Sequence, residues 1–484
     1  MLAIAVSGAL LMLFIRLWIL PFHMLNMGGV DQNVVYGTVR ILHGEPLYGD
    51  PERPPFPIIQ YSPLFFYMHA LVCVASGIGA EEVQEIYVSG RIFSLILNLV
   101  GCWVLFQIAL LLGLSRRSAW IASAFYFCSL FMMYYLRPDA LYSMVFWLHV
   151  WIMVRSDGTG ISGRRIWTLA ATALLCILAK QSGIIVVVFT ALFLIHRSGM
   201  RSLPRFIVAF LFQSMIAGAL MLGIFGWDAL RKNLIWANAN GLDLDHMFAH
   251  FIDPYGLPTV FFLIIGIILS LVMMIGKGGD PNNGSILRLG FITTLLWGLL
   301  TAAKAGSNVN YYNESQMFAV LLLLVFASHY QISRAKALLA LPLWLIVLIS
   351  AVRAGGSFSA VFRTGYYADQ KAVYEKQQAV AERIRENGLG KDEYIYLYER
   401  SYLELLLAQH TALNAKDILL VSGSEYLMDH SDLYAMVLDG RLKYVITGPP
   451  PYSDALGKGH VMMDGMRLSF IMDPFHVHVN ERSR

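Results

Sequence analysis

The chain has 484 residues, of which 57% are hydrophobic and only 14% charged, and its formal net charge is +4. Soluble domains carry about 25% charged residues, so a mean hydropathy of +0.58 excludes a water-soluble globule. No basic patch points to nucleic acid as a partner. The cysteines lie singly in apolar stretches, which disfavours a disulfide framework or a zinc site and indicates small buried hydrophobic residues: Cys73, Cys102, Cys128 and Cys176.

Apolar runs of about 20 residues cross a bilayer, and this pattern predicts an α-helical polytopic membrane protein of about eleven spans. The first run has no basic residue before it and no small-residue cleavage pattern, so it is expected to be an uncleaved span. The two short runs around residue 180 could instead form one kinked element. The predicted spans are 2–22, 91–113, 118–136, 139–154, 166–179, 183–195, 205–226, 258–276, 286–303, 314–328 and 335–352.

The orientation depends on the apolar stretch 61–79. Pro63 and His69 weaken it as a span, so we expect it to lie at the membrane surface or to dip in and return. The corners at Arg137-Pro138-Asp139 and Lys180-Gln181 then lie outside. Five basic loops face the cytoplasm, as the positive-inside rule requires: those with Arg116-Arg117, Arg155 and Arg164-Arg165, Arg197, Arg201 and Arg205, Lys277 and Arg288, and Arg334 and Lys336. If 61–79 did span, these loops would face outward unless the N-terminus also changed sides.

The composition changes near residue 364. Residues 370–387 read as an amphipathic helix ending at Asn387-Gly388, followed by a strand at 394–398, a helix at 403–409 and a strand at 444–447. This alternation predicts a small α/β domain. The expected organisation is therefore a transmembrane domain, 1–363, with a first outer loop at 23–90, and an extracytoplasmic domain, 364–484.

Candidate catalytic residues gather on the predicted outer side. Asp31 follows the first span, where a carboxylate can act as a general base; alternatively it caps the following helix. Arg137 and Asp139 begin the fourth span, and Asp139 has the same capping alternative. Arg137 could pair with Asp139 or bind phosphate in bidentate fashion.

Two further polar stretches fall on the same side. Lys180-Gln181-Ser182-Gly183 separates two apolar runs and is either functional or a simple polar hairpin. Gly306 to Tyr311 forms a polar turn that leads into a helix. Charges close to a membrane are costly and often mark function, so we expect these stretches to meet Asp31 and Asp139 around one pocket.

Two groups of residues give weaker signals. The loop 227–257 is rich in acidic residues and histidine, but its spacing fits no metal-ligand template, so a solvated acidic loop is the alternative to a divalent-metal site. Its members are Asp228, Asp243, Asp245, His246, His250 and Asp253. Near the C-terminus, His476 and His478 alternate as they would on a strand.

The order of these motifs resembles the GT-C superfamily of integral-membrane glycosyltransferases. The similarity covers roughly residues 1–350, and the nearest kin are bacterial relatives of dolichyl-phosphate-mannose protein mannosyltransferases and lipid A aminoarabinose transferase. It rests on Asp31 after the first span, then Gly44-Glu45-Pro46-Leu47-Tyr48, Tyr61-Ser62-Pro63-Leu64, Arg137-Pro138-Asp139, Lys180-Gln181-Ser182-Gly183 and Gly306-Ser307-Asn308-Val309-Asn310-Tyr311.

The resemblance implies transfer of a sugar from a polyprenyl-phosphate donor to a lipid, glycan or protein acceptor at the outer face of a bacterial inner membrane. It implies no cofactor, and a divalent metal is left open. Asp31 and Asp139 match the catalytic carboxylates, and Arg137, Lys180 and Arg53 are the candidates for the donor phosphate. The expected substrate-lining residues are Gln32, Tyr61, Gln181, Asn310 and Tyr311.

The chain departs from the family pattern at two points. The family often has a second acidic residue after the first-loop aspartate, whereas here Gln32 follows Asp31. Some members also have a basic residue where this chain has Gln60-Tyr61-Ser62. A transporter or flippase is the alternative function, although such proteins usually show inverted repeats, and none is visible here. A membrane-anchored binding protein is a third.

Overall fold

The structure is a computed structural model whose chain forms two compact units, each assembled from separate segments. Unit 1 comprises Met1–Leu20, Arg91–Gly218 and Leu242–Phe362, and unit 2 comprises Pro21–Gly90, Ala219–Gly241 and Arg363–Arg484. The residues described are 2–23, 30–129, 136–155, 161–252, 257–275, 282–329, 362–398, 401–414, 427–448 and 462–483.

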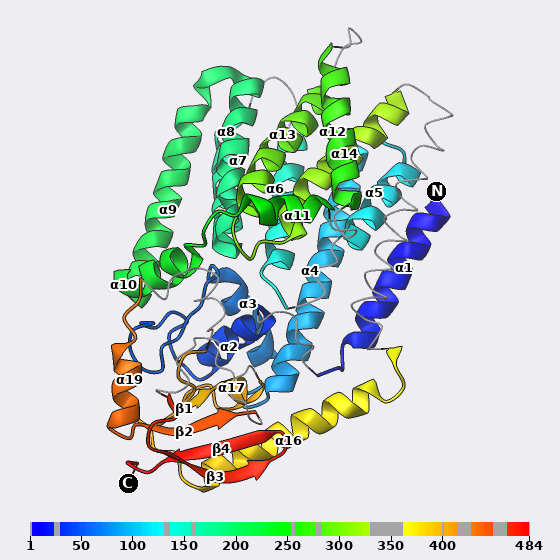
Figure 1. The fold of residues 1–484 in the computed structure, drawn as a ribbon. Coiled ribbons are helices and arrows are strands. Elements are labelled where there is room, and N and C mark those ends of the chain that lie inside the picture. Colours follow the sequence, from blue (N-terminus) through cyan, green and yellow to red (C-terminus); the bar gives the residue numbers. More distant parts are fainter. Residues whose placement is uncertain are drawn as a thin grey trace. The chain divides into compact units, whose positions relative to one another are not determined.

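Unit 1 is a bundle of apolar helices, many of which run alongside one another in Figure 1. Its elements are α1 (Leu2–Ile19), most of α4 (Val83–Leu111), α5 (Arg116–Ser129), α6 (Asp139–Val154), α7 (Gly163–Ala179), η2 (Gln181–Ile184), α8 (Ile185–Ser198), η3 (Gly199–Arg201), most of α9 (Leu203–Phe225), α11 (Leu244–Ile252), α12 (Leu257–Ile275), α13 (Asn282–Ala302), η6 (Val309–Tyr312) and α14 (Asn313–His329).

The outer surface of this bundle is apolar, as a lipid-facing surface must be. In α9 only 6% of the most apolar 18-residue window is buried, although its mean hydropathy is 2.2. A soluble protein could not expose such a stretch to water, because large contiguous apolar patches promote association. These helices therefore identify a membrane protein. The large apolar side chains that α9 exposes include Ile207, Val208, Leu211, Phe212, Met215, Ile216 and Leu220.

Polar side chains link the helices from inside. The ring of His149 in α6 lies 2.7 Å from the hydroxyl of Thr172 in α7 and 2.8 Å from that of Thr190 in α8. Gln316 of α14 donates to Thr259 of α12 at 2.7 Å. Since lipid offers no hydrogen-bond partners, such contacts fix how neighbouring helices face each other.

Ten of the eleven predicted apolar runs coincide with helices over the residues that the structure describes; residues 130–135 and 276 and the whole eleventh run, 335–352, lie outside them. Within the described residues, four helical stretches are long and apolar enough to cross a bilayer by themselves: Val83–Leu111, Gln181–Arg201, Leu203–Phe225 and Gly284–Ala302. The stretch 61–79 forms only the 12-residue helix α3 (Leu64–Ala75), which is short for a span.

Unit 2 joins the first outer loop to the C-terminal part of the chain. Besides α3 and the adjoining ends of α4 and α9, it contains α2 (Val30–Leu42), α10 (Trp227–Leu230), η4 (Arg231–Ile235), η5 (Trp236–Asn238), α16 (Tyr366–Glu386), β1 (Tyr394–Leu397), α17 (Leu403–Leu406), α19 (Ser431–Leu438), β2 (Leu442–Thr447), β3 (Met466–Met472) and β4 (Phe475–Asn480).

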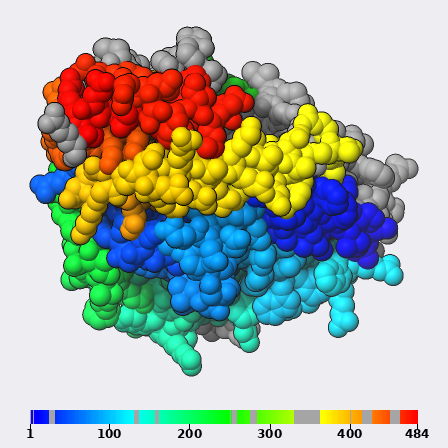
Figure 2. Space-filling view, turned by 90° about the horizontal axis from the view of Figure 1, so that it is seen from below, coloured from blue at the N-terminus to red at the C-terminus, as the bar shows by residue number. Residues whose placement is uncertain are grey.

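The strands form one four-stranded sheet in the order β1-β2-β4-β3. Strand β1 pairs with β2 in parallel, whereas β4 is antiparallel to both β2 and β3. Figure 2 shows α16 alongside the C-terminal strands, and the guanidinium of Arg383 in α16 lies 4.4 Å from the ring centre of Phe470 in β3. The predicted helix at 370–387 and both predicted strands are confirmed, and the alternating His476 and His478 both lie in β4.

The first outer loop supplies part of the core beneath this sheet. Phe56 and Ile58 are fully buried in one cluster with Tyr396 of β1 and Leu442 and Val445 of β2. Burying a large apolar side chain stabilises a fold by roughly 1.5–3 kcal/mol. The loop and the sheet therefore depend on a shared core.

Asparagine side chains satisfy the backbone of the loop next to Ile58. The amide groups of Ile58 and Ile59 donate to the side chains of Asn414 and Asn233 at 2.8 and 2.7 Å. Asn33 donates to the carbonyl of Ile58 at 2.6 Å, and Asn238 to that of Gln60 at 2.8 Å. A buried loop without sheet partners needs such side chains, and here three separate segments of unit 2 supply them.

An ion cluster fixes the same loop to η4. The ammonium of Lys232 is buried and lies 2.7 Å from a carboxylate oxygen of Asp50 and 2.6 Å from one of Glu52. Arg53, three residues beyond Asp50, is 80% exposed and lies 3.7 Å from Asp50. Both cations pair with Asp50, but only Lys232 is buried.

We predict that Lys232→Met lowers the free energy of unfolding by about 1–3 kcal/mol, because it leaves two partly buried carboxylates without their cation. The thermal unfolding midpoint of the detergent-solubilised protein measures this. Arg53→Met is the matched control, since an exposed pair contributes at most about 1 kcal/mol. Equal shifts in both variants would contradict the assignment.

The same cluster predicts a pH dependence. Burial raises the pKa of Asp50, but the hydrogen bond from Lys232 and the neighbouring positive charges outweigh it, so the pKa is lowered from its ordinary value. A lowered carboxyl pKa gives stability that is present above the unfolded-state value, about 4, and lost as the pH falls through the folded-state value. The stability difference between Lys232→Met and the wild type should therefore narrow below about pH 4. A difference that stays constant to pH 3 would exclude this role for Asp50.

Candidate active site

Asp139 is the centre of a buried polar cluster in unit 1. One oxygen of its carboxylate accepts a hydrogen bond from the ammonium of Lys180 at 2.7 Å and another from the side chain of Asn310 at 2.7 Å. All three residues are buried. Arg137 is buried too and acts on the same carboxylate through its charge. Three of the predicted motifs thus meet at one carboxylate.

A break between two helices places Lys180 in this cluster. Helix α7 ends at Ala179, and Lys180 has an extended backbone with φ −155° and ψ 135°. The chain then turns so closely that a Cβ on Gly183 would lie 2.4 Å from the backbone of Cys176. Only glycine fits there, so the Lys-Gln-Ser-Gly motif separates two helices rather than bending one.

The turn before α14 delivers Asn310 and Tyr311. Gly306 has a positive φ of 74°, which glycine adopts without strain. The side chain of Asn308 accepts from the amide of Val309 and caps η6. Asn310 then contacts Asp139, and the ring centre of Tyr311 lies 4.6 Å from the ammonium of Lys180, within cation–π range.

Further charged groups surround Lys180. Its charge acts on Glu314, a buried carboxylate in the first turn of α14. Burial and the charge of Lys180 lower the pKa of Lys304, which precedes η6. Cations that repel one another in a partly buried region favour an anionic ligand, because its charge relieves the repulsion.

The capping alternative for Asp139 does not describe this geometry. The residue at the cap of α6 is Pro138, which has no side-chain hydrogen-bonding group, and Asp139 lies inside the first turn. Its carboxylate instead contacts Lys180 and Asn310, which come from other elements. Gln181 follows directly in η2 and is partly exposed.

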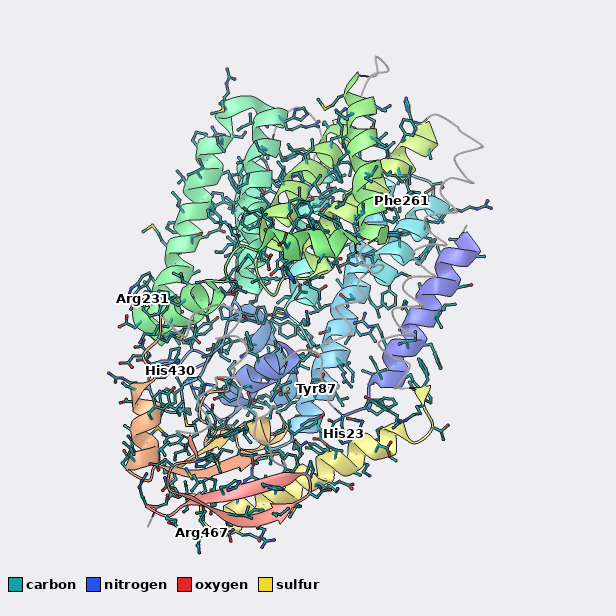
Figure 3. The ribbon with its side chains drawn as sticks, in the orientation of Figure 1. His23, Tyr87, Arg231, Phe261, His430 and Arg467 are labelled. Carbon is teal, nitrogen blue, oxygen red and sulfur yellow. The ribbon has the colours of Figure 1, made fainter. Side chains whose placement is uncertain are left out.

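Asp31 occupies a buried position in unit 2. It lies in the first turn of α2, and its carboxylate accepts from the hydroxyl of Tyr87 at 3.0 Å; Figure 3 labels Tyr87 on α4. The neighbouring Gln32 donates through its side-chain nitrogen to the carboxylate of Glu404 at 2.7 Å and to the carbonyl of Ser401 at 3.0 Å. Asp31 therefore makes a tertiary contact in addition to its position near the start of a helix.

The other first-loop candidates are more open. Tyr61 is partly exposed, and its carbonyl accepts from the hydroxyl of Tyr48 at 2.7 Å. Arg53 is mostly exposed. The structure thus gathers Arg137, Asp139, Lys180, Asn310 and Tyr311 within unit 1 and holds Asp31 and Gln32 within unit 2. That both groups line one pocket stays a prediction.

Three residues of these clusters were not singled out by the sequence. Glu314 lies just beyond the polar turn from Gly306 to Tyr311, and a carboxylate in the first turn of an apolar helix is a usable signal. Tyr87 and Glu404 carry no local signal, because their partners Asp31 and Gln32 lie 56 and 372 residues away.

Three residues of the acidic loop make contacts within the protein. Asp243 accepts from the amide of His246 at 2.9 Å, before α11, and the ring of His246 lies 3.0 Å from the carbonyl of Ser307. Asp228 pairs with Arg231 at 3.1 Å. Among the described residues, no group of three or more His, Cys, Asp or Glu side chains is arranged to hold a metal ion; Asp253 lies outside them.

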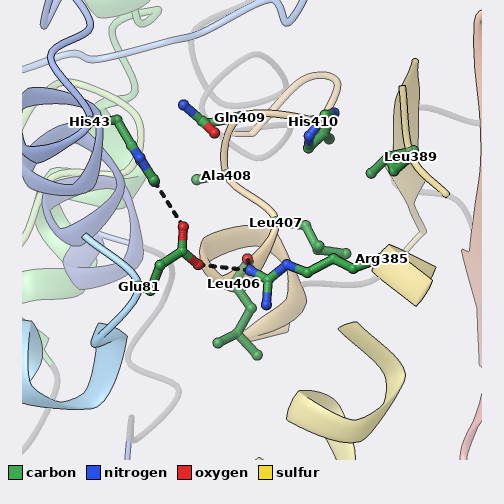
Figure 4. Close-up of a pocket in the computed structure, with 9 residues that line it drawn as sticks. All are labelled: His43, Glu81, Arg385, Leu389, Leu406, Leu407, Ala408, Gln409 and His410. Atoms are coloured by element: carbon green, nitrogen blue, oxygen red, sulfur yellow. Dashed lines mark hydrogen bonds and ion pairs between the residues drawn. The ribbon is translucent and has the colours of Figure 1, made fainter. Parts of the chain in front are cut away.

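A cavity of about 120 Å³ opens at the surface of unit 2 (Figure 4). Glu81 lies on one side, 2.8 Å from the guanidinium of Arg385 and 3.7 Å from the ring of His43. The end of α17 and the turn that follows it, from Leu406 to His410, line the cavity together with Leu389. First-loop and C-terminal residues thus build this hollow together.

Taken together, the structure has an apolar helical bundle with buried ions at helix breaks, and a smaller unit that combines an outer loop with a C-terminal sheet. This combination is that of a polytopic membrane protein with an additional sheet-containing unit.

Comparison with solved structures supports this fold over the full chain. ArnT from Cupriavidus metallidurans bound to undecaprenyl phosphate aligns with a TM-score of 0.56 and 12% identity, covering 100% of this chain and 98% of that one. The oligosaccharyltransferase AglB from Archaeoglobus fulgidus, in complex with an inhibitory peptide and a dolichol-phosphate, aligns with a TM-score of 0.54 and 11% identity, covering 99% and 74%.

A second structure of the Archaeoglobus fulgidus oligosaccharyltransferase, with Zn and sulfate, aligns with a TM-score of 0.53 and 12% identity, covering 99% of this chain and 73% of that one. At the level of sequence, no family model and no curated protein matches the chain. The likeness is therefore one of fold, and it agrees with the resemblance that the motifs indicated.

The buried ion pair of Asp139 and Lys180 predicts the outcome of a double-mutant cycle on the free energy of unfolding. Lys180→Met should lower the free energy of unfolding by about 3–5 kcal/mol, because the carboxylate of Asp139 stays buried without its cation. The double variant Asp139→Asn/Lys180→Met should recover much of this loss, since neither charge remains. Thermal unfolding in detergent measures both.

Arg201→Met is the control for this cycle, because Arg201 is an exposed cation beyond α8. A loss for Lys180→Met no larger than that for Arg201→Met would contradict a buried ion pair.

Proposed function

We propose that this protein transfers a sugar from a polyprenyl-phosphate-linked donor to an acceptor on the outer face of a bacterial plasma membrane. The observation that carries the proposal is the buried cluster of Arg137, Asp139 and Lys180 in an apolar bundle. Two proteins of the same fold, ArnT and AglB, hold undecaprenyl phosphate and a dolichol-phosphate, which supports a polyprenyl phosphate as the anionic ligand.

The donor phosphate is neutralised by Lys180 and Arg137 in this proposal. A buried phosphate needs cations to offset its charge, and a guanidinium can bind two of its oxygens. Asp139 and Asn310 hold the ammonium of Lys180 in place. Lys304 adds positive charge nearby. The exposed Arg53 then contributes less to phosphate binding than Lys180 and Arg137.

The reaction needs few chemical groups from the protein. The acceptor hydroxyl or amine gives its proton to Asp31 and attacks the anomeric carbon. The bond from that carbon to the phosphate oxygen breaks, its electron pair stays on the oxygen, and polyprenyl phosphate leaves. Attack opposite the leaving group inverts the anomeric centre. The protein contributes positioning, a base and charge stabilisation.

We predict that Asp31→Asn lowers the rate of transfer by about 100-fold or more, the loss typical of a missing general base. The asparagine oxygen still accepts from Tyr87, so the thermal unfolding midpoint should stay unchanged. The assay incubates purified protein with radiolabelled polyprenyl-phosphate sugars and membrane extracts, and follows the labelled acceptor and the released polyprenyl phosphate.

Asp228→Asn is the matched control, because Asp228 is an exposed carboxylate of unit 2. It should keep wild-type transfer. Full activity in Asp31→Asn would exclude Asp31 as the base. Uptake of labelled substrate into liposomes without any glycosyl product would instead favour the transporter or flippase function.

The proposed orientation predicts which surface residues can be labelled in a bacterial host. We expect Asp439→Cys, in the exposed turn after α19, to react with a membrane-impermeant maleimide in cells whose outer membrane has been permeabilised. Arg201→Cys, in a predicted cytoplasmic loop, should react only after lysis. The mass shift of the labelled protein on a gel measures both reactions. The unsubstituted protein shows how much label the native cysteines take up. The reverse pattern would overturn the orientation.

A further inference from the structure

The side-chain amide of Gln32 donates both of its hydrogens to acceptors in the C-terminal part of the chain. An amide nitrogen carries two hydrogens, and that of Gln32 lies 2.7 Å from a carboxylate oxygen of Glu404 and 3.0 Å from the carbonyl of Ser401. Both Gln32 and Glu404 are 5% exposed. A buried carboxylate is costly unless donors reach it, so this contact is specific rather than incidental.

Glu404 is itself firmly attached to the sheet. It lies in the short helix α17, and its carbonyl accepts from the hydroxyl of Thr411. Residues 410–412 then run beside β1, where the amide of Ile395 donates to His410 and that of Ala412 donates to Ile395, both at 2.8 Å. A movement of Glu404 would therefore disturb the edge of the sheet.

The first turn of α2 is held from two directions. Neighbouring residues of a helix point about 100° apart, so Asp31 and Gln32 face different partners. The carboxylate of Asp31 accepts from Tyr87 on α4, and Gln32 contacts Glu404 on α17. The residue next to Asp31 in the sequence is thus bonded to one that lies 372 positions further along the chain.

We propose that Glu404 is a positioning residue of the transfer site, which makes the C-terminal region a working part of the enzyme rather than an accessory domain. The proposal rests on the proposed function, in which Asp31 is the base. Glu404 acts through Gln32: it fixes the start of α2 and hence the direction of the Asp31 carboxylate. A misplacement of about 1 Å in a reacting group can cost about 100-fold in rate.

Four variants test this role, and one of them exchanges the side chains of positions 32 and 404. Glu404→Ala should lower kcat about 10- to 100-fold with the KM for the donor nearly unchanged. Gln32→Glu should also lower kcat, because two carboxylates then face each other. Glu404→Gln keeps the size of the side chain and should lose less than Glu404→Ala. The double variant Gln32→Glu/Glu404→Gln restores one carboxylate and one amide, but position 32 then has no donor for the carbonyl of Ser401, so it should recover only part of the kcat that Gln32→Glu loses.

Glu393→Gln is the matched control. Glu393 is another carboxylate of the C-terminal region, and it bonds to Lys443 at 2.7 Å, so its loss should leave kcat unchanged. Wild-type kcat in Glu404→Ala, or a swap no better than Gln32→Glu alone, would overturn the proposal.

Hydrogen–deuterium exchange separates this proposal from the proposed function. The amides of α2 should exchange faster in Glu404→Ala than in the wild type or in Glu393→Gln. If the wild type transfers no sugar, the proposed function fails, and faster exchange still supports the coupling of Glu404 to α2. If transfer is normal but α2 exchange is the same in all three proteins, the positioning role fails alone.

Discussion

A lysine buried in an apolar bundle must find its counter-charge inside the protein, and Lys180 finds it in Asp139 at 2.7 Å. This requirement brings the break after α7, the start of α6 and the turn at η6 to the same place, because each contributes one member of the cluster. Lys180 follows the end of α7, Asp139 begins α6 and Asn310 precedes α14, so all three side chains lie at the ends of helices. The polar cluster is therefore a consequence of where the helices stop.

Unit 2 obeys a different constraint. Its first outer loop has little regular structure between α2 and α3, so its backbone groups need partners from elsewhere. Asn33, Asn233 and Asn414 provide them, Lys232 balances two loop carboxylates, and Phe56 and Ile58 enter the core below the sheet. The loop has a defined shape because three distant segments enclose it.

The sequence allowed the helices and the C-terminal strands to be predicted, because both rest on local periodicity. It also singled out Asp139, Lys180 and Asn310 one by one, and these residues do meet. What it could not provide were pairings without a local pattern. Glu404 lies in a stretch predicted as a helix over 403–409, yet α17 ends at Leu406 because the following residues turn to bond β1. Lys232 lies in a loop noted for its acids, and nothing near it in sequence indicates Asp50.

The shared core of unit 2 can form only after the C-terminal strands have been synthesised. Residues 21–90 leave the ribosome early, but the strands that cover Phe56 and Ile58 are made last. Until then the loop exposes apolar side chains and unpaired amides, a state prone to aggregation. Such distant contacts also slow folding, because the closure of a long chain costs entropy before any contact repays it. A chain truncated before β2 would therefore have an unfolded first outer loop, although the sequence of that loop is complete. Quality-control proteases could then cleave it.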